Sequence, residues 1–298
     1  MADFDARETV PAFHGDPAVK AELLAELEAG VVAPLSVSGP ETPDAAAWAA
    51  RVGLPLALVL LTAHLGRAVS HLPLALVAAI EPGATIVAVA HLAPLWAWDG
   101  APDPLRPMMV SAIGQAAGVE AVSLHRRMAA GGAVSRAEWR AVRASLGRLG
   151  QWAGEGGRND EALAATVMAA CCWDYATAPG AAVDMLNAWE GLVTERLRRA
   201  DGWGEAEDEL FQQLIRAQRT LALEALGPEP TDDPEAAKAH GRELVERLLE
   251  RLNTSQDPLP ARKAALNERI AAARTELREQ IAGALLGIVR EPAPTVAS

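Results

Sequence analysis

The chain has 298 residues, half of them apolar, which is enough for one large or two medium-sized domains. Ala, Leu, Arg and Glu are abundant, and because all four favour helices the composition predicts an all-α protein. The net charge of −12 opposes contact with a phosphate backbone and therefore disfavours nucleic acid as a partner.

Helix start and stop signals divide the first half of the chain into short helical segments. Asp16, followed by a proline, predicts an N-cap and a helix that runs to Gly30. Residues 31–43 contain three prolines and no periodicity, so a loop is expected there. Helical patterns then cover 44–52, 55–69, 73–80 and 86–98.

Two longer helices follow. Asp103, again before a proline, predicts the start of a helix that runs to residue 128 and ends at the glycine pair 131–132. Ser135 and Glu138 have the spacing of a capping box and predict a helix to about residue 152. The compact basic clusters of the chain lie here, and they are His125-Arg126-Arg127 and the set Arg136, Arg140 and Arg143.

The segment GEGGR, residues 154–158, is the best candidate for a linker between domains. It has three glycines in five residues and lies where the charge balance changes, from −3 over residues 1–150 to −9 over residues 151–298. The sequence therefore predicts an Ala/Leu-rich helical domain over 1–154 and an acidic helical bundle over 159–298.

The second half ends in the two most regular helices, which follow helical patterns at 160–177, 181–200 and 205–226. Asp233 and Asp257, each before a proline, start the last two helices, which end near Leu252 and Val289. The short loop NTSQ predicts that they form an antiparallel hairpin. The first of the two carries an apolar stripe of Leu244, Val245, Leu248, Leu249 and Leu252. The apolar stripe on the last helix is expected to pack on its own domain or, alternatively, to form a dimer seam; it comprises Leu259, Leu266, Ile270, Leu277, Ile281, Leu285 and Ile288.

Residues 53–98 are strongly apolar and contain LPLALV twice, which raises the question of a membrane span. A span needs about twenty apolar residues without charge. Arg67, Glu81 and Asp99 limit the uncharged runs to 15, 13 and 17 residues, and four prolines interrupt them further. We therefore expect short buried helices of a soluble domain, and no membrane partner.

Histidine clustering in the first half offers a metal site as an alternative interpretation of the same region. His64 and His71 are seven residues apart, but Gly66 and Pro73 interrupt a shared helix. No HExxH, HxH or Cys/His ligand spacing occurs. Core histidines are thus expected, with no metal ligand and no cofactor; those in the first half are His14, His64, His71, His91 and His125.

The motifs of common catalytic sites are missing, since the chain has no GxGxxG after a strand, no Walker loop and no GxSxG. Cys172-Trp173-Asp174-Tyr175 places a thiol near a carboxylate, but no cation lies within a helical turn to activate it. Cys171 and Cys172 are expected to be buried and unbridged, and the acidic start has no secretory signal, so a cytoplasmic location is expected. No catalytic residue is assigned.

Four segments carry a resemblance to a known family: FHGDPAVKAELLAELEA (13–29), RVGLP (51–55), AIEPGA (79–84) and GAVSRAEWRAVR (132–143). Together they resemble an uncharacterised family of bacterial and phage-associated helical proteins, with an HGDP..K start and a VS.AEW helix. The resemblance covers about residues 12–152 and implies a helical fold but no activity. The family's Gly/Cys-rich segment is replaced here by GVVAPLSVSGPE, which has no cysteine.

These patterns lead to two hypotheses of function. The first is a non-catalytic interaction or regulatory protein that binds another protein or a second copy of itself through amphipathic helices. The alternative is an enzyme or metal-binding helical protein that uses the N-terminal histidines.

Overall fold

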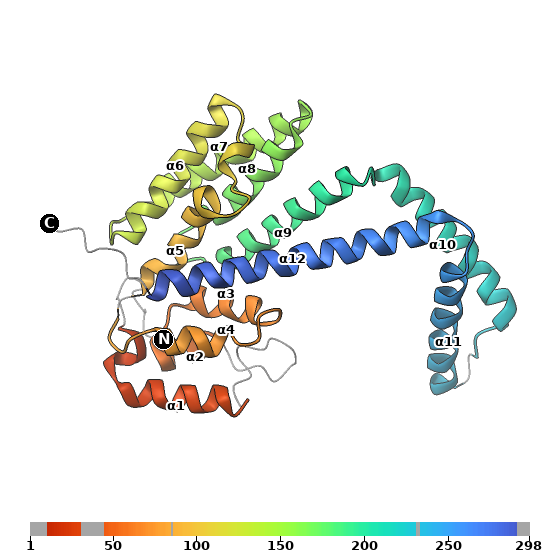
Figure 1. Ribbon diagram of the computed structural model, residues 1–298, viewed down its shortest axis with the longest axis horizontal. Coiled ribbons are helices and arrows are strands. Elements are labelled where there is room, and N and C mark those ends of the chain that lie inside the picture. The colour runs from red at the N-terminus through yellow and green to blue at the C-terminus, as the bar shows by residue number, and fades with distance from the viewer. Residues whose placement is uncertain (1–10, 31–44, 85, 231–232, 291–298) are drawn as a thin grey trace. The chain divides into compact units, whose positions relative to one another are not determined.

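The computed structural model describes residues 11–30, 45–84, 86–230 and 233–290. These residues form α-helices, a few short 3-10 and π-helical turns and no strand, so the all-α prediction is confirmed (Figure 1). The helices are α1 Pro17–Glu28, α2 Ala45–Val52, α3 Leu56–Gly66, α4 Leu72–Ala79, α5 Val87–Leu95, α6 Ala112–Ala129, α7 Arg136–Glu155, α8 Asn159–Cys171, α9 Ala181–Ala200, α10 Glu205–Leu226, α11 Pro234–Asn253 and α12 Pro258–Arg290.

The chain divides into two compact units, at places other than the predicted boundary. Unit 1 comprises Met1–Leu192 and Arg274–Ser298, and unit 2 comprises Val193–Ala273. The GEGGR segment lies inside unit 1, where it forms the last two residues of α7 and the turn to α8, and these two helices pack closely against each other. A Cβ atom at Gly150 of α7 would lie 3.5 Å from the Ala162 carbonyl oxygen of α8, which is an ordinary van der Waals contact.

The caps predicted from local spacing are present. The Asp16 carboxylate accepts a hydrogen bond from Ala18 N at 2.8 Å. Ser135 and Glu138 form the full capping box at the start of α7. The helix predicted from Asp103 is an error, since α6 begins only at Ala112, where the Ser111 hydroxyl accepts from Gly114 N at 2.9 Å.

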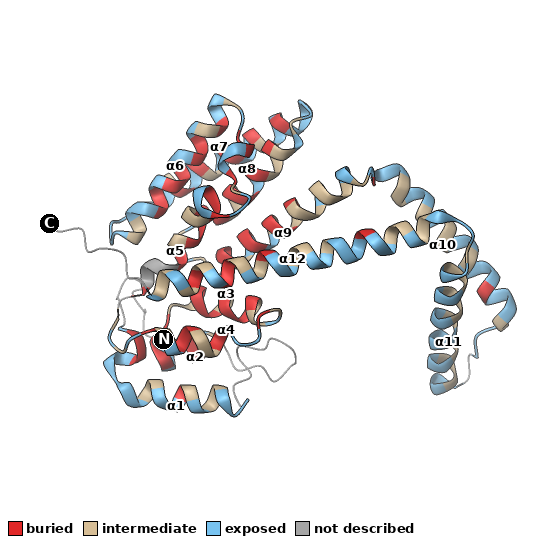
Figure 2. Cartoon of the chain, viewed as in Figure 1, coloured by how far each residue is buried: buried red, intermediate tan, exposed pale blue. Residues whose placement is uncertain are grey.

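The apolar stretch after Gly53 forms helices α3, α4 and α5 of unit 1. Leu58, Leu61 and Leu65 of α3 are fully buried, and Leu72 and Leu76 of α4 nearly so (Figure 2). Among the described residues, no single helix has both the length and the apolar composition needed to cross a membrane, and the one combination that does is the sharply bent pair α2 and α3.

Unit 2 has a small core. Among its described residues the buried ones are Trp203, Ala222 and Leu266. Trp203 packs edge-on against Phe211, its Nε1 donates to Asp208 Oδ1 at 2.7 Å, and Lys263 Nζ lies 4.5 Å from the ring centroid.

The partner of α11 differs from the expected one. Helix α11 packs mainly against α10 rather than forming an antiparallel hairpin with α12, as Figure 1 also shows. The sequence showed an apolar stripe on each of the last two helices but not which helix would cover it. On α12, Leu277, Ile281 and Leu285 are at most 5 % exposed, so they pack on their own chain and are not available as a dimer seam.

Candidate functional site

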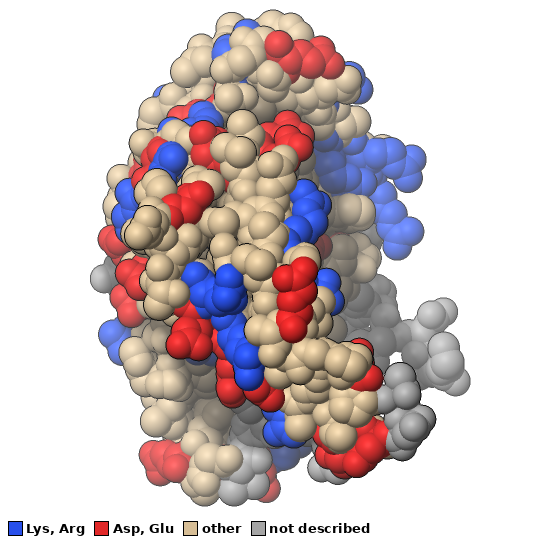
Figure 3. Space-filling view, turned by 90° about the vertical axis from the view of Figure 1, so that its right-hand side faces the viewer, with Lys and Arg blue, Asp and Glu red and all other residues tan. Residues whose placement is uncertain are grey.

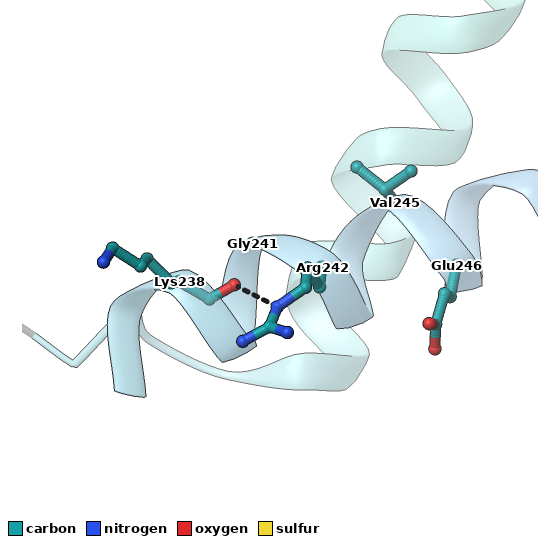
Figure 4. Close-up of a pocket in the computed structure, with 5 residues that line it drawn as sticks. All are labelled: Lys238, Gly241, Arg242, Val245 and Glu246. Atoms are coloured by element: carbon teal, nitrogen blue, oxygen red, sulfur yellow. Dashed lines mark hydrogen bonds between the residues drawn. The ribbon is translucent and has the colours of Figure 1, made fainter. Parts of the chain in front are cut away.

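The first candidate surface lies on α11, where an open groove of about 760 Å³ runs along one helix face (Figure 4). Lys238, Gly241, Arg242, Val245 and Glu246 line it. No residue of α11 is buried, although the helix is amphipathic. An amphipathic helix that buries no side chain completely leaves apolar surface in water, which is typical of an interaction site.

The charges along the groove are ordered. Lys238 and Arg242 lie toward the N-terminal end, Val245 in the middle is 55 % exposed, and Glu246 follows it. Lys238 pairs with Glu235 at 2.7 Å, whereas Arg242 donates only to the Lys238 carbonyl at 3.4 Å.

Arg242 and Glu246 are four residues apart on one helix, yet within the described chain neither has an ion-pair partner. Leu249, one helical turn beyond Val245, is 54 % exposed. Figure 3 shows a face of the molecule where basic and acidic groups alternate with uncharged side chains. The α11 patch, defined as Lys238, Gly241, Arg242, Val245, Glu246 and Leu249, thus combines an apolar centre with unpaired charges of both signs.

The second candidate site lies in unit 1 and involves two of the histidines noted in the sequence. His91 on α5 and His125 on α6 are 1 % and 0 % exposed, and their Nδ1 atoms lie 3.0 Å apart. The His91 ring stacks on Tyr175 with 4.6 Å between centroids, and His125 lies 4.9 Å from Trp139 of α7. Because α5 packs on α6 and α6 on α7, the fold brings these side chains together from distant parts of the sequence.

Both imidazoles are neutral near pH 7. Burial lowers the pKa of His91 to about 4, although the Asp174 carboxylate acts in the opposite direction. Burial also lowers the pKa of His125, with a smaller contribution from His91. A hydrogen bond between two neutral rings requires that one Nδ1 carries the hydrogen and the other accepts it.

The other first-half histidines lie elsewhere. His14 Nε2 is 3.0 Å from the carbonyl oxygens of Ala50 and Arg51, at the end of α2. His64 Nε2 lies 3.9 Å from the Glu190 carboxylate, and His71 is exposed at the start of α4. No group of three or more His, Cys, Asp or Glu side chains in the described ranges has a geometry that could hold a metal ion.

The two cysteines are free and buried, as the sequence indicated. Both thiols donate to the Met168 carbonyl at 3.0 Å. Interaction with Cys172, together with burial, raises the pKa of the Cys171 thiol well above its usual value. A thiol in this state is a packing element rather than a nucleophile.

The basic cluster on α7 lines a separate pocket of about 330 Å³ together with Trp139 and Trp173. The Arg143 guanidinium lies 3.5 Å above the Trp173 ring and donates to the Cys172 carbonyl at 3.1 Å. Arg143 is therefore tied to its own chain, which leaves Arg136 and Arg140 as the remaining members of the cluster.

No protein-family model, curated protein or solved structure matches the chain. The two candidate sites therefore rest on geometry. His91, His125 and the apolar stripe of α11 are recognisable in the sequence. The stacking of His91 on Tyr175 is not, because Tyr175 lies 50 residues beyond His125 and no sequence pattern relates it to the histidines.

Proposed function

We propose that the protein is a non-catalytic interaction protein whose α11 patch binds a second copy of the same chain. The observation that carries the proposal is the order of the patch, with Arg242 and Glu246 unpaired on either side of exposed Val245. In a two-fold interface the same surface is used by both copies and must be complementary to itself. A basic end, an apolar middle and an acidic end meet this condition.

The expected arrangement is an antiparallel pair of α11 helices. Arg242 of each copy then faces Glu246 of the other copy, and Lys238 approaches Glu250 of the other copy. The two copies of Val245 then meet near the axis, and Leu249 lies opposite Ala239 of the other copy, so both apolar side chains lose exposed area. Gly241 has no atom within 4 Å of an added Cβ, so the groove beside it is open for a side chain of the second copy.

The association is expected to be weak. Val245 and Leu249 are only half exposed, so burying each contributes about 1 kcal/mol, or about 4 kcal/mol for the four side chains of two copies. A gain of about 4 kcal/mol is no larger than the cost of lost translational and rotational freedom on association, so the Kd should be about 1 mM or weaker. The protein should therefore be monomeric when dilute and dimeric when concentrated.

Sedimentation velocity over a wide concentration range tests the proposal. Arg242→Glu and Glu246→Arg should each weaken dimerisation, because each places like charges face to face. The double variant R242E/E246R restores opposite charges and should dimerise again. Exposed Arg247→Glu on the same helix, whose present partner is Glu243 at 2.7 Å, serves as the matched charge-change control.

Two outcomes would overturn the proposal: a wild-type chain that stays monomeric at the highest concentration, or a charge swap that fails to rescue an otherwise folded variant. If the α11 patch instead binds a different protein, the wild-type chain stays monomeric, and binding of another protein replaces self-association as the proposed function of the patch. The cytoplasmic location belongs to the same proposal and is supported by the free thiols of Cys171 and Cys172. The alternative of a metal-binding or catalytic histidine set is not adopted, since of those histidines only His91 and His125 meet.

A further inference from the structure

Unit 1 contains a cavity of about 390 Å³, within the range of small-molecule sites. Its walls come from the start of the described chain, α2, the α2–α3 turn and the first residues of α3, α5, the end of α6 and the segment after α8. Most of the lining is apolar and small, including Ala46, Ala49 and Ala50 of α2. The side chains with polar atoms are His91, Asp174, Tyr175 and His14, whose Nε2 is occupied by the carbonyls at the end of α2, and no Lys or Arg is among the described residues that line it.

His91 is the one buried histidine that reaches this cavity. Its Nδ1 is engaged with His125, and the stack on Tyr175 fixes the plane of the ring. Its Nε2 has no hydrogen-bond partner within the described chain, yet this nitrogen is not completely enclosed by protein atoms. Because His91 lines the cavity, the exposed part of Nε2 lies on the cavity wall. A polar atom left in this state in an apolar site costs free energy unless a ligand or water satisfies it.

The hydrogen on the histidine pair can be assigned from the surroundings of His125. His125 Nε2 is enclosed and has no hydrogen-bond partner in the described chain, and a backbone group of Cys171 raises the pKa of His125 against the larger effect of burial. Since Nδ1 of His125 faces His91, we assign the hydrogen of His125 to Nε2, so that its Nδ1 accepts from Nδ1–H of His91. His91 Nε2 then has a free lone pair and presents a hydrogen-bond acceptor to the cavity.

The rim of the cavity is built with unusual backbone geometry. Phe13 and His14 both have a φ of 53°, a left-handed conformation that is costly outside glycine. Gly53 has a φ of 66°, and a Cβ there would lie 2.7 Å from the Pro11 carbonyl oxygen. His14 holds the end of α2 through the Ala50 and Arg51 carbonyls, so these contacts fix the wall that α2 contributes.

We infer that this cavity binds a small, mainly apolar, uncharged molecule that donates one hydrogen bond, from a hydroxyl or N–H group, to Nε2 of His91. The apolar walls select the body of the ligand, and the acceptor on His91 selects the donor group. An anion does not fit, because the lining offers the Asp174 carboxylate and no cationic side chain from Lys or Arg in the described chain. This site is separate from the α11 patch and does not depend on self-association.

Matched pairs of small probes test the inference on the full chain. Each pair has a donor member and a methylated counterpart: 2-naphthol and 2-methoxynaphthalene, indole and 1-methylindole, benzyl alcohol and benzyl methyl ether. Saturation-transfer NMR identifies binders and calorimetry measures the affinities. The donor member of at least one pair should bind about tenfold more tightly than its counterpart, as expected for one hydrogen bond in an apolar site, and 2-naphthoate should not bind to the cavity.

Two variants locate the binding. His91→Phe keeps an aromatic ring against Tyr175 but removes the acceptor, so the two members of each pair should bind equally. Ala50→Phe fills the cavity from an exposed position on α2 and should abolish binding without requiring His91 to change. His71→Ala changes an exposed histidine that does not line the cavity and should leave the affinities unaltered.

The inference is overturned if no donor probe binds to the wild-type chain, or if donor and methylated probes bind equally to it. It is also overturned if Ala50→Phe, folded by circular dichroism, binds a donor probe as tightly as the wild type. Because Ala50→Phe does not alter the histidine pair, it tests whether the probes bind in this cavity even if His91→Phe fails to fold.

Discussion

Nδ1 of His91 lies 3.0 Å from Nδ1 of His125, and both rings are buried in unit 1. One hydrogen serves both nitrogens, so protonation of His125 at Nδ1 would place two N–H groups against each other, and protonation of His91 at Nε2 would put a charge into a buried, mainly apolar site. The pair therefore makes the folded state sensitive to acid, and the sign of the effect follows from the pKa of His91.

Stability should fall as the pH drops from about 6.5 to about 4. A histidine in the unfolded chain has a pKa near 6.5, whereas burial lowers the pKa of His91 to about 4, so the unfolded chain binds more protons in this window. The contribution of His91 is fully present above pH 6.5, and about 3 kcal/mol of the free energy of unfolding is lost by pH 4. Urea unfolding at half-unit pH steps measures the slope.

The matched variants for this prediction are His91→Gln and His71→Gln. The first removes the buried titrating group and should flatten the slope between pH 6.5 and 4, even though it lowers stability at pH 7. The second changes an exposed histidine and should leave the slope as in the wild type. A slope that is unaffected by His91→Gln would contradict the assignment.

Breaking the Glu190–Arg278 pair should destabilise unit 1. Glu190 is 6 % exposed and accepts two hydrogen bonds from Arg278, at 2.7 and 2.9 Å. Burial raises the pKa of Glu190, but nearby His64 and the Arg278 guanidinium outweigh it and lower the pKa to about 2. Arg278→Met leaves this carboxylate buried beside weaker partners and should cost about 3 kcal/mol of the free energy of unfolding.

The control for this pair is Arg247→Met, which removes the exposed partner of Glu243 on α11 and should cost less than about 0.5 kcal/mol. The double variant E190Q/R278M removes both charges and should recover part of the loss. Chemical unfolding at pH 7 compares the three. Equal costs for Arg278→Met and Arg247→Met would show that the Glu190 pair is no stronger than a surface pair.

Unit 2 should depend on Trp203. It is the one large aromatic side chain buried among the described residues of that unit, and Asp208, Phe211 and Lys263 all contact it. Trp203→Ala should therefore lower the free energy of unfolding of unit 2 by about 3–5 kcal/mol and unfold α10 and α11. Circular dichroism would show the lost helicity, and limited proteolysis would show rapid cleavage within residues 193–273. Trp152→Ala, at a tryptophan that is 47 % exposed, should leave both readouts nearly unchanged.

Features that depend on neighbouring residues were predictable from the sequence, and features that depend on distant ones were not. The caps at Asp16 and Ser135 are local, and both are present. Asp103 carries the same local signal, but the Ser111 side chain, whose hydroxyl also donates to buried Glu161 at 2.5 Å, determines where α6 begins. Because Glu161 lies on α8, that choice depends on tertiary packing.

The same distinction explains the domain boundary and the buried cluster. GEGGR has the composition of a linker, but α7 and α8 on either side of it pack closely against each other, which keeps the segment inside unit 1. His91 and His125 are 34 residues apart, and no periodicity in the sequence relates them. The apolar stripe on α12 was recognisable in the sequence, but its packing partner was not. The burial of Leu277 and Ile281 shows that these residues pack against other parts of the same chain.

Two glycine substitutions should have opposite effects on stability. A Cβ at Gly118 of α6 would lie 2.1 Å from the Trp98 ring, which is itself 2 % exposed and has little room to move. Gly118→Ala should therefore cost about 1–3 kcal/mol through overpacking. Gly147 of α7 has nothing within 4 Å of an added Cβ, so Gly147→Ala should stabilise the helix by about 0.5–1 kcal/mol. Thermal unfolding of the two variants beside the wild type measures both effects, and a Gly118→Ala variant as stable as the wild type would mean that α6 does not approach Trp98 this closely.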